Sequence, residues 1–101
     1  MEYKIYLTYN AKKMINEHIE FLSKVSIKAA INLKQIFKEY IIILKHFPYL
    51  GKKINKKLPT YIGKMVINKR YILIYFLINN KIYIDKILDS RQNNKIKNQK
   101  F

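Results

Sequence analysis

The chain has 101 residues, and half of them are hydrophobic, which is enough to form one domain around a hydrophobic core. The absence of cysteine excludes disulfides and thiolate metal sites, and no apolar run approaches the ~18 residues that a membrane-spanning helix needs. Lysine and arginine outnumber aspartate and glutamate by 21 to 6, and the net charge of +15 favours nucleic acid, the ribosome or an acidic protein as partner.

An A+T-rich coding sequence would explain part of the lysine content, because lysine, isoleucine, asparagine and tyrosine dominate the whole chain. Only two of the 21 basic residues are arginines. The first residues lack the basic segment, apolar stretch and small-residue cleavage site of a signal peptide. We therefore expect a cytoplasmic protein that has no membrane partner.

The N-terminal segment predicts a strand followed by a helix. Side chains alternate in polarity from Tyr3 to Tyr9, as in a half-buried strand. Asn10 is a candidate N-cap for the helix that follows. Apolar residues then recur at spacings of three and four as far as Leu22, and we expect this helix to end near Ser23.

A second, longer helix is predicted between Ser26, a candidate N-cap, and Pro48, because the residue before a proline is pushed out of the α region. One face of this helix is apolar, and we expect it to lie in the core. Its residues step by three and four, with three isoleucines widening the face: Ala30, Leu33, Phe37, Tyr40, Leu44 and Phe47, beside Ile31, Ile36 and Ile41.

The rest of the chain predicts a turn, a loop and three strands. Pro48 to Gly51 forms the turn, and Lys52 to Pro59 is expected to be a basic loop. Strands rich in β-branched and aromatic residues follow, and Asn79-Asn80 separates the last two as a tight hairpin turn, since asparagine tolerates positive φ.

The expected fold is therefore an α+β domain over residues 1–91, in the order β-α-α-β-β-β. The helix hairpin is expected to pack on a twisted antiparallel sheet. Residues 92–101 are polar and basic, and we interpret them as a tail outside the domain.

Four short segments follow one another in a recognisable order: Ser26–Ala30, Phe47–Lys52, Lys64–Ile67 with Tyr71–Tyr75, and Ile87–Asn93. They resemble the second-helix start, the Phe-Pro-x-x-Gly-Arg turn, the basic strand with its Tyr-x-x-x-Tyr partner and the closing segment of the RelE/ParE superfamily of bacterial type II toxins. The resemblance covers roughly residues 3 to 93. It implies a toxin that a small acidic antitoxin neutralises by wrapping its basic groove and helix hairpin.

The superfamily has two activities, and the resemblance implies different site residues for each. RelE-like members cleave mRNA in the ribosomal A site, whereas ParE-like members bind and inhibit DNA gyrase. In the nuclease interpretation Arg91, Arg70 and Lys64 would stabilise the phosphate, and Asp89 or a lysine would move protons.

Departures from the nuclease pattern favour the ParE-like interpretation. Ile72 stands where RelE-like nucleases carry an arginine, and Asp89 replaces the histidine of the closing motif. No tyrosine follows Tyr83, although the nucleases carry one near the position of Lys97. A ribosome-dependent endoribonuclease is the alternative, and a non-toxic RNA-binding module is a third hypothesis.

Basic side chains are the candidates for contacts with a partner or nucleic acid. Arginine can grip a carboxylate or phosphate with two hydrogen bonds, which lysine cannot do, although a solvated loop is the simpler interpretation of the lysine run. The candidates are Lys52, Lys53, Lys56, Lys57, Lys64, Lys69, Arg70 and Arg91.

The two histidines do not indicate a metal site. His18 lies on the apolar face of the first predicted helix, where a half-buried structural imidazole is the simpler interpretation, and His46 lies in the last turn of the second. Because no other ligand is clustered near them in the sequence, we expect neither a metal nor a cofactor.

Overall fold

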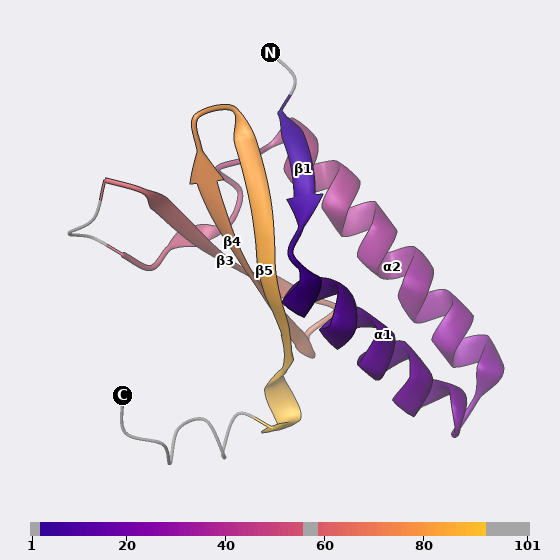
Figure 1. The fold of residues 1–101 in the computed structure, drawn as a ribbon. Helices are drawn as coiled ribbons and strands as arrows, with labels where there is room; N and C mark the ends of the chain where they lie inside the picture. The colour runs from indigo at the N-terminus through magenta and orange to yellow at the C-terminus, as the bar shows by residue number, and fades with distance from the viewer. Residues whose placement is uncertain (1–2, 56–58, 93–101) are drawn as a thin grey trace.

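The computed structural model describes residues 3–55 and 59–92, and within them two helices pack against one face of a five-stranded sheet (Figure 1). Across the sheet the strand order is β1-β5-β4-β3-β2. The predicted α+β architecture, with the helix hairpin on a sheet, is confirmed. The elements are β1 (Lys4–Leu7), α1 (Tyr9–Ser23), α2 (Ile27–His46), β2 (Lys52–Lys53), β3 (Tyr61–Ile67), β4 (Tyr71–Ile78), β5 (Lys81–Asp89) and the 3-10 helix η1 (Ser90–Gln92).

The sheet is mixed, whereas the sequence predicted antiparallel strands throughout. β3, β4 and β5 form the expected antiparallel meander, but β1 runs parallel to β5, with Lys4 opposite Lys81 and Leu7 opposite Ile84. In addition, β2 pairs with β3 as a short edge strand inside the predicted basic loop. Two residues are too few to show the alternation by which a strand is recognised in a sequence.

The first helix begins earlier than the sequence predicted. Thr8 is its N-cap, since the Thr8 Oγ1 accepts a hydrogen bond from the Ala11 N–H at 3.0 Å, and Asn10 lies inside the first turn. The Thr8 N–H also donates to the Ile84 carbonyl of β5 at 3.0 Å. This tertiary contact fixes Thr8 in the extended conformation that a cap requires, and the prediction of Asn10 was wrong.

The second helix follows its predicted limits. Ser26 Oγ accepts from the Ala29 N–H at 3.1 Å, and the helix ends at His46, two residues before the proline. Two of the predicted core residues are wrong, because Ile31 is 67% exposed and Phe47 is 63% exposed. The buried face comprises Ala30, Leu33, Phe37 and Leu44.

The core lies between the helices and the inner face of the sheet. Alternate side chains of β3, β4 and β5 point toward α1 and α2, so each strand contributes a regular set of buried residues. The Phe37 ring of α2 meets the Tyr71 ring edge-on at a centroid distance of 5.2 Å. The inner face consists of Met65, Ile67, Tyr71, Leu73, Tyr75, Leu77, Ile82, Ile84 and Ile87.

The buried hydroxyl of Tyr75 holds the turn that follows α2. It donates to the Pro48 carbonyl at 2.7 Å and accepts from the Gly51 N–H at 3.1 Å. The Tyr61 hydroxyl donates to the Gly51 carbonyl. The ring of Tyr75 leaves no space at Gly51, where a Cβ would lie 2.7 Å from Tyr75 Cε1, or at Gly63 of β3.

Both hairpin turns use residues with positive φ. Asn79 has φ 56°, which confirms the predicted turn between β4 and β5. Between β3 and β4, Asn68 and Lys69 have φ values of 54° and 59°, and the Arg70 N–H donates to the Ile67 carbonyl at 3.1 Å. Lys69, a candidate binding residue, therefore lies at the exposed tip of this turn.

We expect Gly63→Ala to lower the free energy of unfolding by about 1–3 kcal/mol, because the added methyl group would overlap the Tyr75 ring. Urea denaturation of the two proteins measures the difference. In a Tyr75→Leu background the same substitution should cost less, since the ring is gone. An equal loss in both backgrounds would contradict this explanation.

Stability should also fall at high pH through Tyr75. Burial raises the pKa of Tyr75 to about 12, partly offset by the hydrogen bond from the Gly51 backbone, whereas an unfolded tyrosine has a pKa of about 10. The folded protein thus keeps a proton that the unfolded chain has lost, so this contribution is complete below pH ~10 and disappears as the pH rises through ~12.

Melting temperatures measured from pH 9 to 12 test this linkage, with Tyr75→Phe as the matched variant that cannot ionise at this position. We expect the melting temperature of the unaltered protein to fall more steeply than that of the variant. Parallel curves would show that another group controls the alkaline transition.

Candidate functional site

Three of the candidate site residues meet at the end of β5. Asp89 is buried, and its Oδ2 lies 3.0 Å from Arg91 Nη2 and 3.6 Å from Arg70 Nη2. Its Oδ1 accepts from the Arg91 backbone N–H at 2.9 Å and from the Arg91 Nε at 3.3 Å. The carboxylate is therefore shared between two guanidinium groups.

The register of the sheet brings these residues together. Asp89 pairs with Tyr71, so the arginine that precedes Tyr71 in the turn and the arginine that follows Asp89 in η1 lie at the same end of the sheet. The Ser90 N–H donates to the Arg70 carbonyl at 2.7 Å. The Arg70 guanidinium lies 5.3 Å from the centre of the Tyr71 ring.

A hollow of about 440 Å³ adjoins this cluster, between α1 and the end of β5. It is lined by Glu17, His18, Phe21, Asp89 and Arg91. His18 Nε2 lies 2.6 Å from the Ile87 carbonyl oxygen and, because a carbonyl can only accept, Nε2 carries the proton. His18 thus anchors α1 to β5, which agrees with the structural role expected from the sequence.

Lys64 does not join the cluster. It is exposed on the face of the sheet away from the helices, where it lies opposite Ile74 of β4 and Lys52 of β2. Asp89 points to the inner face, where the helices lie. Successive strand residues point to opposite faces, so this separation follows from the register. The structure consequently brings Arg70, Asp89 and Arg91 together and leaves Lys64 on the other side of the sheet.

The remaining candidates are spread over the surface. Lys52 and Lys53 are exposed on β2, and Lys69 is exposed in the turn between β3 and β4. Lys56 and Lys57 lie outside the described residues.

Within the described ranges, no group of three or more histidine, aspartate or glutamate side chains could hold a metal ion. The helices of the same ranges include none with the length and hydropathy of a membrane span.

Sequence reasoning missed an apolar surface on the side of the sheet away from the helices, which we call the outer face. All eight residues of β4 are apolar, and only alternate ones face the core. Such an uninterrupted run is typical of a strand covered on both faces, and this signal could have been recognised. The apolar residues of the outer face are Tyr6, Ile62, Val66, Ile72, Ile74, Phe76, Ile78, Tyr83 and Leu88.

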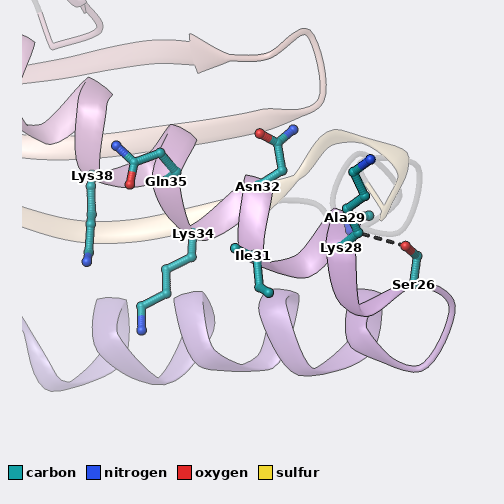
Figure 2. A pocket seen from close by; sticks show the side chains of 8 residues that line it. All are labelled: Ser26, Lys28, Ala29, Ile31, Asn32, Lys34, Gln35 and Lys38. Atoms are coloured by element: carbon teal, nitrogen blue, oxygen red, sulfur yellow. Dashed lines mark hydrogen bonds between the residues drawn. The ribbon is translucent and has the colours of Figure 1, made fainter.

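A second hollow, of about 880 Å³, lies along the surface of α2. Figure 2 shows Ile31, Lys34 and Lys38 pointing to one side of the helix, while Asn32 and Gln35 point to the other. All five side chains are exposed. None of the candidate site residues lines this hollow, and its mixture of separated lysines and amides does not form a convergent site.

No family model matches the sequence, and no curated protein matches it significantly by sequence. A solved structure does match, with a TM-score of 0.70 over 87% of this chain and 96% of the other: a chain from a structure described as the chromosomal ParDE TA system from P. aeruginosa. This chain therefore shares its fold with a chain of that system, and we call this the ParDE-type fold. The two chains are 14% identical, so the likeness shows the fold alone, and the activity has to be argued from the chemistry of the site.

In this ParDE-type fold, Asp89 should be the residue of the cluster on which stability depends. We expect Asp89→Asn to lower the free energy of unfolding by about 1–3 kcal/mol, because it removes the negative charge that Arg70 and Arg91 share. Arg91→Gln is the matched control, and it should cost less than about 1 kcal/mol because the Arg91 side chain is 56% exposed. Chemical denaturation compares them, and equal losses would contradict a central role for the carboxylate.

Proposed function

We propose that the chain is the toxin of a type II toxin–antitoxin pair, that it acts as ParE-like toxins do by binding DNA gyrase, and that a small acidic antitoxin neutralises it. The ParDE-type fold supports membership of such a pair. The net charge of +15 supports an acidic partner, since complementary charge speeds association.

The state of Asp89 is the observation that carries the choice of a binding mechanism over RNA cleavage. Cleavage by the 2′-hydroxyl requires a group that accepts its proton. Oδ1 of Asp89 already accepts from the backbone N–H and Nε of Arg91, and Oδ2 faces both guanidinium groups. A substrate proton would have to displace these donors.

The cations around the cluster support the same choice. A phosphorane needs several positive groups directed at one point. Here Lys64 lies on the outer face, and both arginines form ion pairs with the carboxylate of Asp89. Ile72 stands where the nuclease pattern has a further arginine. Arg70 and Arg91 lie beside Asp89 at the end of the sheet, whereas Lys64 lies on the opposite face, so the three cations do not converge on one point.

In the decisive experiment, the purified protein is assayed against two targets, gyrase and translating ribosomes. With gyrase and relaxed plasmid, we expect supercoiling to be inhibited. In a cell-free translation reaction, primer extension should show an intact message with and without ribosomes. Ribosome-dependent cuts within codons would overturn the proposal and establish the endoribonuclease alternative.

Arg91→Ala separates the two outcomes further. Gyrase inhibition should survive this substitution, because Arg91 forms an ion pair with Asp89 and has no catalytic role in the proposed mechanism. If the message is cut by the unaltered protein and spared by Arg91→Ala at the same concentration, the arginine belongs to a nuclease site and the proposed mechanism is wrong.

A further inference from the structure

The sheet is apolar on both faces, although α1 and α2 cover only one of them (Figure 1). On the outer face, Ile72, Ile74 and Phe76 of β4 are half-buried by their neighbours, and Ile78 is 45% exposed. Val66 of the adjacent strand is 54% exposed. Contiguous apolar surface of this kind usually marks a site of interaction.

These side chains form a stripe along β4. Val66 and Leu88 flank Ile72 on the two neighbouring strands, and Ile62 and Tyr83 flank Phe76 in the same way. Six residue steps separate the first and last outward residues of β4, and at about 3.3 Å per residue the stripe is roughly 20 Å long. An α-helix of about 13 residues has this length, at 1.5 Å per residue.

Lysines lie on both sides of the stripe. Lys64 of β3 and Lys86 of β5 stand opposite Ile74 on its two sides, and Lys81 stands opposite Ile78. Lys52 and Lys4 extend these rows onto the edge strands, opposite Lys64 and Lys81. The carboxylates of the described strands are Asp85, at the bulge in β5, and Asp89, which faces the helices.

This arrangement of charge selects among the possible occupants. A second copy of the chain would place lysines against lysines. A single-stranded nucleic acid would place phosphates beside the lysines. It would also cover the aliphatic residues between them with polar phosphate and sugar, whereas burial of aliphatic surface is favourable only against apolar groups. An acidic amphipathic helix supplies both kinds of group. It also satisfies its own backbone hydrogen bonds, so it needs no free strand edge.

We propose that the outer face binds an amphipathic helix of a partner protein, with the apolar side of the helix along β4 and carboxylates on both flanks toward Lys64 and Lys86. The binding site is defined by its own chemistry. Only the identification of that partner as the antitoxin rests on the proposed function. The helix covers surface that the protein's own helices leave exposed.

The test uses a designed peptide of about 14 residues, long enough for the stripe, with leucines on one helical face and glutamates on both flanks, labelled with fluorescein. We expect saturable binding by fluorescence anisotropy, helix formation by circular dichroism and an affinity that falls about tenfold when salt is raised from ~0.1 to ~1 M. A scrambled peptide and a peptide with lysines in place of glutamates should bind at least ~10-fold more weakly.

Variants locate the site. Ile74→Ser should weaken peptide binding at least ~10-fold because it lies at the centre of the stripe. Lys64→Glu with Lys86→Glu should do the same, and both lysines are exposed, so the fold does not depend on them. Ile42→Ser and Lys38→Glu on α2 are the matched controls, since Ile42 is 56% exposed and Lys38 is also exposed, and they should leave binding unchanged.

Four outcomes would overturn the inference. The acidic peptide does not bind, or the α2 variants weaken its binding as much as the outer-face variants do. A single-stranded RNA oligonucleotide displaces the peptide from the outer face at lower concentration than the unlabelled peptide does. The last such outcome would be a dimer, detected by sedimentation, that Ile74→Ser dissociates, because a second copy of the chain would then be the occupant. A negative gyrase assay leaves these measurements unaffected, so failure of the proposed function is distinguishable from failure of this inference.

Discussion

The hydroxyl of Tyr75 is the point at which the helical layer and the sheet are joined. It accepts from Gly51 and donates to Pro48, so the chain leaving α2 is fixed against the middle of the sheet. The close approach of this ring requires the absence of a side chain at Gly51 and Gly63. The turn then delivers the following residues to the edge of β3, where they form β2. The position of α2 over the core and the composition of the sheet edge both follow from this contact.

Local signals were sufficient where the structure depends on local chemistry. The limits of α2 follow from a serine cap and a proline, and the β4–β5 turn follows from the tolerance of Asn79 for positive φ. The cap of α1 could not be predicted in this way. Thr8 displaces Asn10 because it is held by β5, through a hydrogen bond to the carbonyl of Asp85, 77 residues away. The parallel pairing of β1 depends on the same distant strand.

The candidate site shows the same division. The sequence identified Arg70, Asp89 and Arg91 as unusual residues, and the register of the sheet brings them into contact. It could not show that the carboxylate would point to the inner face while Lys64 points outward, because that relation depends on the pairing of three strands. The apolar outer face was visible in the composition of β4, but its meaning requires knowing that the helices lie on one side only.

The pairing of the first strand with the last determines the order in which the molecule can be assembled during synthesis. Residues 4–7 leave the ribosome long before their partners in β5, and their pairing with that strand is complete only when residue 84 has emerged. Contacts of such large sequence separation slow folding, since a long loop must close before they form. A truncated translation product that lacks β5 would therefore lose the strand that joins β1 to β4. The toxic activity proposed for this protein would then arise only after β5 has been synthesised.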